Sequence, residues 1–140
     1  MNLFRPASSI TTEAAHAAVG AGVTKAAELE WRINVVVVDR GGNLIALLRN
    51  EDAPLLSTSL AIDKAYTALS FNMSGKDWNQ VPGAPSDEVR RGIATRERLA
   101  VFGGCLPKKS GTLPGASGEI EEQDEICIRA ALAFSDADML

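Results

Sequence analysis

The sequence predicts an α/β domain in which helices cover the faces of an antiparallel β-sheet. Residues 35–38 are four consecutive valines, a β-branched run typical of a strand that is buried on both sides. Small apolar residues recur at helical spacing before and after this run, around residues 15–27 and 61–69. With 140 residues and a hydrophobic content of 46%, the chain has room for one core, so residues 1–140 are expected to form a single domain.

The first helix is expected after an irregular segment, residues 1–9. Thr11 or Thr12 can cap this helix, and Glu13 suits its positive end. Its predicted apolar stripe is made almost wholly of alanine, glycine and valine, at Ala15, Ala18, Val19, Gly22, Val23, Ala26 and Ala27. Such a stripe permits close approach to a sheet or to another helix. His16 lies just off it.

A hairpin and a second helix are expected next. Residues 39–43 contain two glycines and predict a turn, after which residues 44–48 return as an antiparallel strand that Arg49 closes. Pro54 suits the first turn of a helix that extends to about residue 71. The buried face of this helix is predicted at Ala61, Ala65, Ala68 and Leu69, with Lys64 and Thr67 on an adjacent strip.

The second half of the chain is predicted to alternate turns with short elements. They are a loop at residues 72–86, a charged helix at 87–98, strands at 99–102 and 113–117, and a last helix at 121–134. Ser86 can cap the charged helix, and Cys127 falls on the apolar stripe of the last one.

Composition excludes several classes of function. The net charge of −4 and the absence of a basic cluster argue against a nucleic-acid partner. No run of about 18 apolar residues predicts a membrane span. The N-terminus has no basic region followed by an apolar run, and the two cysteines have no zinc-ligand spacing, so we expect a cytoplasmic protein without a metal site.

Lys64 and Arg49 are the first candidates for ligand binding. A lysine beside a small-residue helical face can hold an anion as a point charge, and an arginine at a strand end can form a fork with a carboxylate. The alternative is that both side chains are exposed, with Lys64 paired to Asp63 or Glu51.

The stretch Gly115, Ala116, Ser117, Gly118 is the second candidate. Glycines before a helix can present backbone N–H groups to an anion, and Asp124 could add a side-chain contact. The alternative is a tight loop that only caps the last helix. His16, the single histidine, is a candidate haem ligand or an exposed residue without a role, and Cys105 is a weaker thiolate candidate.

Several segments together resemble the GlcG/HbpS-like family, which includes the C-terminal domain of PduO proteins. They are VVVVDRGGNLIALLRNEDAP, STSLAIDKAYTA, FGGCLP and GASGEIEEQDEICIRAAL, in that order, and the resemblance extends over about residues 10–134. The chain departs from the family at Thr112, Leu113 and Pro114, where the family usually has Gly-Ala-Ile.

The resemblance implies a profilin-like fold, with an antiparallel sheet of about five strands, and a homo-oligomer. It also implies haem as a cofactor, since some members bind or degrade it. The residues that match the family's motifs at the proposed site are Arg49, Lys64, Thr67, Gly115, Ser117, Gly118 and Asp124.

Two functions of different classes follow. The first is a small-molecule-binding protein that holds haem, or another molecule carrying a carboxylate, between Lys64, Arg49 and residues 115–118. The alternative is a hydrolase or isomerase of a bacterial catabolic pathway, acting on a small carboxylate or an aromatic ring-cleavage product. In that case Lys64 or Arg49 would bind the carboxylate of the substrate. Asp124, Glu122 or Cys105 would move protons.

Overall fold

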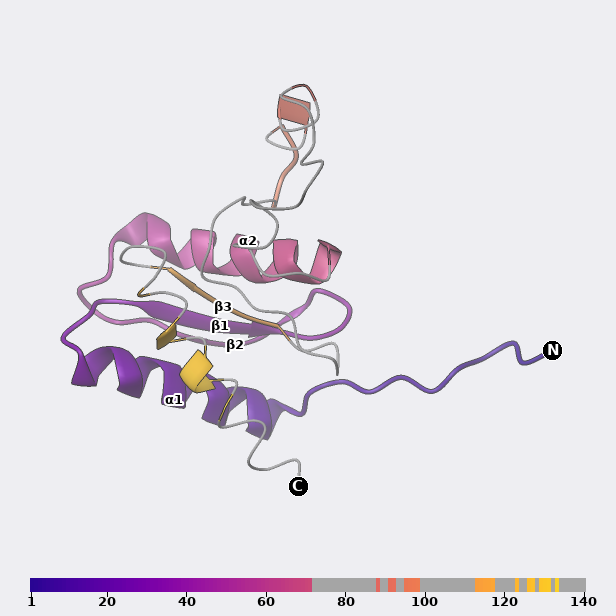
Figure 1. Ribbon diagram of the computed structural model, residues 1–140, viewed down its shortest axis with the longest axis horizontal. Helices are drawn as coiled ribbons and strands as arrows, with labels where there is room; N and C mark the ends of the chain where they lie inside the picture. Colours follow the sequence, from indigo (N-terminus) through magenta and orange to yellow (C-terminus); the bar gives the residue numbers. More distant parts are fainter. Residues whose placement is uncertain are drawn as a thin grey trace.

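A three-stranded antiparallel sheet lies between two helices in the computed structural model, which describes residues 1–71, 88, 91–92, 95–98, 113–117, 123, 126–127, 129–131 and 133 (Figure 1). The elements are α1 (Thr12–Glu28), β1 (Asn34–Val38), β2 (Leu44–Leu48), α2 (Leu55–Phe71) and β3 (Leu113–Ser117). The α/β class with an antiparallel sheet is confirmed. About five strands were expected, and the described residues form three; the strand predicted at 99–102 lies outside them.

β1 is the centre of the sheet, in the order β2-β1-β3, and all five of its residues are buried. Because side chains alternate along a strand, its two faces serve different layers. Val35 and Val37 pack in one cluster with α1, while Val36 and Val38 pack in the other with α2. The prediction of a strand covered on both sides is therefore confirmed.

α1 begins where the sequence predicts, because the Thr11 hydroxyl accepts a hydrogen bond from the N–H of Ala14 at 3.2 Å. Its stripe approaches the sheet closely at Gly22, where a Cβ atom would lie 3.0 Å from the Val35 side chain. Ala27, predicted on the stripe, is exposed, because the helix ends one residue later and its last buried position is Ala26.

The turn between β1 and β2 is organised by Asp39. One of its carboxylate oxygens accepts hydrogen bonds from the backbone N–H groups of Gly41 (2.8 Å) and Asn43 (2.9 Å). These bonds lower the pKa of Asp39, with the Asn43 N–H as the largest cause. Gly42 takes a φ of +82°, a left-handed conformation that favours glycine.

Asn34 ties β1 to the start of α2. Its side-chain amide donates to the hydroxyls of Ser57 (2.9 Å) and Thr58 (3.1 Å). Its amide oxygen accepts from the backbone N–H of Asn50 at 3.0 Å. A fully buried asparagine thus fixes both the β2–α2 loop and the first turn of α2.

The segment at residues 87–98, predicted as one helix, is helical at residues 88, 91 and 92 but forms turns at 95–98. The helix prediction is therefore wrong at 95–98. The Thr95 hydroxyl donates to the carbonyl of Gly92 at 2.7 Å, and Arg98 has a φ of +66°, which a continuing helix does not allow.

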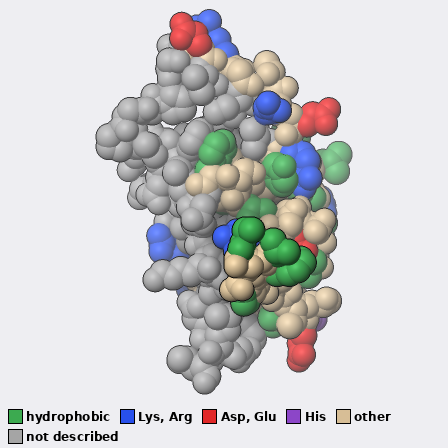
Figure 2. All heavy atoms as spheres, turned by 90° about the vertical axis from the view of Figure 1, so that its right-hand side faces the viewer, with side chains coloured by type: hydrophobic (Ala, Val, Ile, Leu, Met, Phe, Trp, Pro, Cys, Tyr) green, Lys and Arg blue, Asp and Glu red, His purple; other side chains and the backbone are tan. Residues whose placement is uncertain are grey.

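Residues 1–11 differ from the described residues that lie nearest the C-terminus. Residues 1–11 have no helix or strand and extend from the domain, and Leu3 and Phe4 are exposed there. Figure 2, which faces this end, shows apolar side chains in front and basic side chains interspersed with acidic ones. Near the C-terminus, Cys127 and Ala131 are helical and pack in the same cluster as α1.

Candidate functional site

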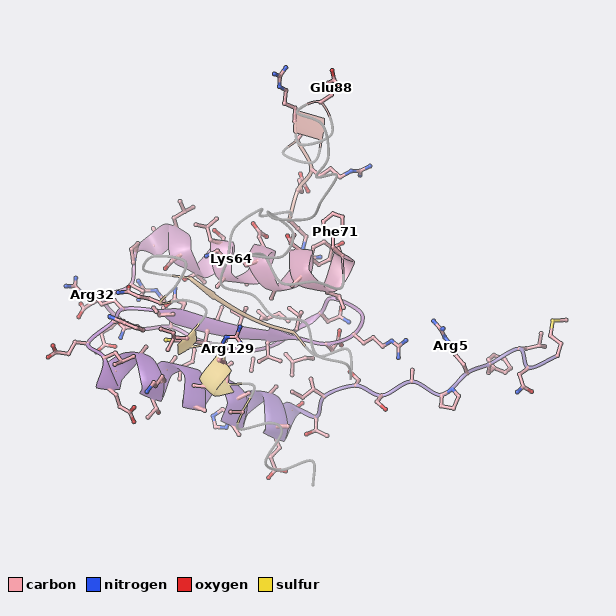
Figure 3. The ribbon with its side chains drawn as sticks, viewed as in Figure 1. Arg5, Arg32, Lys64, Phe71, Glu88 and Arg129 are labelled. Atoms are coloured by element: carbon pink, nitrogen blue, oxygen red, sulfur yellow. The ribbon has the colours of Figure 1, made fainter. Side chains whose placement is uncertain are left out.

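Lys64 and Thr67 lie on the buried face of α2, which we call the α2 inner face. Its residues are Ser57, Ala61, Lys64, Ala65, Thr67 and Ala68. Lys64 is 4% exposed, so the alternative of an exposed lysine is wrong. Figure 3 labels its side chain on α2. It has an interaction partner in the structure, as a buried ammonium group requires.

β3 is the strand that α2 contacts most extensively, so the structure brings the Lys64 helix and part of the glycine stretch together. In β3, Gly115 pairs with Val36 and Ser117 pairs with Asn34 on β1. The remaining predicted residues of this half, Gly118, Glu122, Asp124 and Cys105, lie outside the described residues.

Arg49 is exposed, as the alternative to ligand binding expects, and it also has partners within its own loop. Its guanidinium donates to the backbone carbonyls of Glu51 (3.1 Å) and Ala53 (2.9 Å). These bonds close the loop between β2 and α2. Two of the five guanidinium N–H donors suffice for them, so the rest could still serve an anion.

A cluster around Tyr66 was missed by the sequence-based reasoning. The Arg98 guanidinium lies 4.1 Å from the centre of the Tyr66 ring and donates to the carbonyl of Gly42 at 3.2 Å. Burial raises the pKa of the nearby Asp63 carboxyl, and the positive charge of Arg98 opposes this rise. The cluster joins three distant parts of the chain, so no local pattern could reveal it.

His16 lies on the other side of the sheet from Lys64, because α1 and α2 cover opposite faces (Figure 1). Its side chain is exposed and makes no hydrogen bond with the described part of the chain. Beside it, a Cβ atom at Gly20 would meet nothing within 4 Å. A shallow hollow of about 520 Å³ follows the same helix, lined by Ala17, Ala21, Thr24, Lys25, Glu28 and Ala130.

The described residues offer neither a cluster of metal ligands nor a membrane-spanning helix. They contain no group of three or more histidine, cysteine, aspartate or glutamate side chains placed to hold a metal ion. Within the same residues, every helix is too short or too polar to span a membrane.

Comparison with known proteins gives consistent results. The chain matches the family described as "Haem degrading protein HbpS-like" over residues 10–133. It is 32% identical to the "uncharacterized 15.0 kDa protein in dhaT-dhaS intergenic region" of Citrobacter freundii, covering 97% of this chain and 99% of that protein.

Solved structures agree with this match. Klebsiella pneumoniae protein ORFY superposes with a TM-score of 0.86 at 29% identity, covering 98% of this chain and 97% of that one. A PduOC:heme complex superposes with a TM-score of 0.77 at 27% identity, covering 89% and 94%.

Proposed function

Because the chain belongs to the HbpS-like family, we propose that it binds haem, which His16 would hold through its imidazole. The likeness to the PduOC:heme complex supports this proposal, since the shared fold extends over nearly the whole of both chains. Haem iron accepts an imidazole nitrogen as an axial ligand, and His16 carries the only imidazole in the sequence.

The residues around His16 fit such a group. The observation that carries the proposal is an exposed imidazole on α1 near Gly20, where an added Cβ atom would meet nothing within 4 Å. Ala17 and Ala21 extend the small apolar surface. We call the surface formed by His16, Ala17, Gly20, Ala21 and Thr24 the α1 outer face.

A propionate of haem would find a cation at the end of this face. Lys25 pairs with Glu28 at 3.7 Å, and both side chains are well exposed, so the pair is weak and exchangeable. Haem bound here would supply a redox-active iron, while the chain would supply the axial nitrogen and the charge that orients the propionates.

Lys64 and Thr67 are proposed as a separate anion-binding part, together with positions 115, 117 and 118. A single ligand that contacts both His16 and Lys64 would have to lie between two copies of the chain, because the sheet separates them. The enzyme alternative gains no support, since Asp124 and Glu122 lie outside the described residues.

Titration of the full-length protein with haemin tests the proposal. We expect a saturable shift of the Soret band, its loss in His16→Ala, and weaker binding in Gly20→Leu, which fills the open space beside the imidazole. Glu13→Ala, another exposed position of α1, is the matched control and should bind as the unmodified protein does. A Soret shift that persists unchanged in His16→Ala would refute this assignment.

A second variant distinguishes haem binding on the α1 outer face from binding near the α2 inner face. Lys64→Met should leave the Soret shift intact if haem binds on the α1 outer face. Loss of haem binding in a folded Lys64→Met variant would instead place the ligand near the α2 inner face, or between two copies. Circular dichroism of each variant distinguishes lost binding from lost folding.

A further inference from the structure

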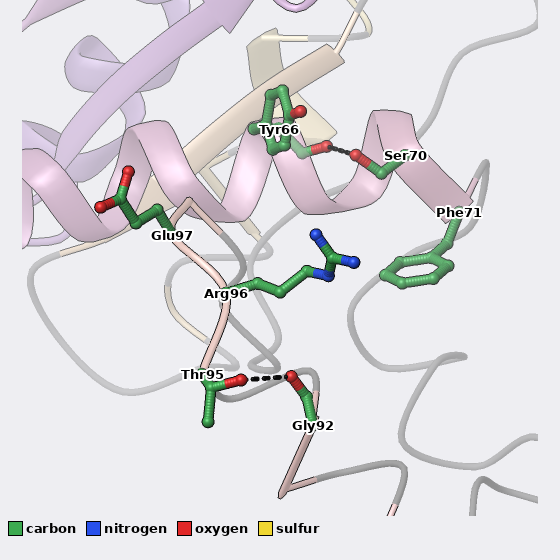
Figure 4. A pocket seen from close by; sticks show the side chains of 7 residues that line it. All are labelled: Tyr66, Ser70, Phe71, Gly92, Thr95, Arg96 and Glu97. Atoms are coloured by element: carbon green, nitrogen blue, oxygen red, sulfur yellow. Dashed lines mark hydrogen bonds between the residues drawn. The ribbon is translucent and has the colours of Figure 1, made fainter.

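A pocket separate from both faces described above lies at the C-terminal end of α2. It is open, with a volume of about 730 Å³. Its lining comes from α2 and from residues 92–97, namely Tyr66, Ser70, Phe71, Gly92, Thr95, Arg96 and Glu97 (Figure 4). We call it the Arg96 pocket.

The positive charge of this pocket is available. Arg96 extends toward Ser70 and Phe71, whereas Glu97 extends in another direction (Figure 4). Within the described part of the chain, the Arg96 guanidinium makes no hydrogen bond or ion pair. A guanidinium presents paired N–H donors in a plane, which matches the two oxygens of a carboxylate.

Aromatic side chains supply the apolar part of the pocket. The Tyr66 ring is held in place, because Arg98 lies 4.1 Å from its centre and its edge packs against Gly42. Phe71 is half-buried at the end of α2 and contributes a second ring. Aromatic rings prefer offset or edge-to-face contact with another ring, so a flat aromatic molecule suits this wall better than a branched aliphatic one.

The aliphatic hydroxyls of the lining already have partners. The Ser70 hydroxyl donates to the carbonyl of Tyr66 at 2.8 Å, and the Thr95 hydroxyl donates to the carbonyl of Gly92 at 2.7 Å. Their protons are therefore engaged, which leaves the Arg96 guanidinium and the Tyr66 hydroxyl as side-chain donors of the lining, and Arg96 is the charged one. Nothing lies within 4 Å of a Cβ atom at Gly92, so the floor at that position is open.

We propose that the Arg96 pocket binds a small aromatic carboxylate, with the carboxylate on Arg96 and the ring against Tyr66 and Phe71. The volume accommodates one or two fused rings. This site differs from the proposed haem site, since α2 and α1 lie on opposite faces of the sheet. It also shares no residue with the α2 inner face.

Calorimetric titration of the full-length protein with 2-naphthoate tests this proposal. We expect saturable binding that Arg96→Ala weakens about tenfold or more, because a charge-assisted hydrogen bond is lost. Arg96→Lys should recover only part of it, since the fork is absent. Arg91→Ala is the matched control, an exposed arginine outside the pocket, and should bind normally.

Two further ligands separate the contributions of charge and ring. The neutral 2-naphthamide should bind far more weakly than 2-naphthoate, and cyclohexanecarboxylate should also be weaker because it is not flat. No saturable binding of 2-naphthoate up to about 1 mM, or equal binding to Arg96→Ala, would overturn the proposal.

The result is independent of the haem proposal. His16→Ala should retain naphthoate binding, and Arg96→Ala should retain the Soret shift with haemin. If Arg96→Ala does not fold, Phe71→Leu provides the second variant, and it should weaken naphthoate more than cyclohexanecarboxylate. Equal effects on the two ligands would count against ring contact.

Discussion

Replacing Asn34 by alanine removes the side chain that joins β1, the β2–α2 loop and α2. Three hydrogen bonds are lost, two donated to Ser57 and Thr58 and one accepted from the Asn50 N–H. A typical protein hydrogen bond contributes about 0.5–1.5 kcal/mol net, so the sum is about 2–4 kcal/mol. Asn34 is fully buried, so water cannot replace the lost partner, and we expect a loss of stability in the upper part of this range.

Urea unfolding measures this loss. For an m-value of about 2 kcal/mol per molar, in the middle of the usual range for urea, the unfolding midpoint of Asn34→Ala should fall by about 1–2 M. Hydrogen exchange adds a local readout, since the amide of Asn50 loses its acceptor and should exchange faster. Asn2→Ala, in the exposed N-terminal segment, is the control and should leave the midpoint unchanged.

An Asn34→Asp variant refines the argument. Aspartate keeps the acceptor but loses the amide donors, and burial would raise its pKa in the folded state. A pKa that is higher in the folded than in the unfolded state stabilises the fold at low pH, and this stability is lost as the pH rises through the folded pKa. The free energy of unfolding of Asn34→Asp should therefore fall toward neutral pH. If the free energy of unfolding of Asn34→Ala lies within about 0.5 kcal/mol of that of the unmodified protein, the three hydrogen bonds do not hold these elements together.

Four further outcomes are expected. Gly42→Ala should destabilise the fold by about 1–3 kcal/mol in urea unfolding, because φ is +82° and the new Cβ would lie 3.1 Å from the Tyr66 ring; Gly20→Ala, with open space around it, should instead stabilise α1 by about 0.5–1 kcal/mol. Asp39 has a lowered pKa, so the unmodified protein should be more stable than Asp39→Ala above pH 3.8. This difference in stability should shrink as the pH falls through the lowered value, and a difference that stays constant would contradict the reasoning. Asp63 has a raised pKa, so the unmodified protein should lose stability as the pH rises from 3.8 through the raised value. Asp63→Asn does not titrate, so its stability relative to the unmodified protein should grow over the same range. A stability difference that does not change with pH would contradict burial as the cause.

The elements that sequence patterns predict well are those decided by local chemistry. The valines of β1, the glycine turn and the Thr11 cap each act within a few residues, and the structure confirms them. β3 was also predicted correctly, although Pro114 lies within it. The proline removes one N–H donor from the strand, and Pro114 is nevertheless paired with Val37 of β1.

The features that local patterns did not reveal depend on distant contacts. Lys64 lies on a helix that packs against β1 and β3, and β3 comes far later in the chain. Asn34 precedes the valine run and looks like an ordinary strand start, and only the folded chain shows Ser57 and Thr58 beside it. The turns at 95–98 arise where Arg98 reaches Tyr66, a contact that no local pattern encodes.

Among the proposed site residues, some could be named from the sequence and others only from the folded chain. His16 and Lys64 were named from residue type and spacing, and the structure adds that they lie on opposite faces of the sheet. The Arg96 pocket could not be predicted, since it forms between α2 and a segment expected to continue as a helix. The functions proposed for His16, Lys64 and the Arg96 pocket remain predictions, which the titrations described above test.

The central position of β1 has a consequence for synthesis of the chain on the ribosome. β2 follows β1 after one short turn, so one edge of β1 can be paired early. The other edge waits for β3, which ends at Ser117, and until then a nascent chain presents an uncharged, β-branched edge to its neighbours. Slow translation between β2 and β3 would prolong this exposure, whereas a chaperone that covers the valine run would shorten it.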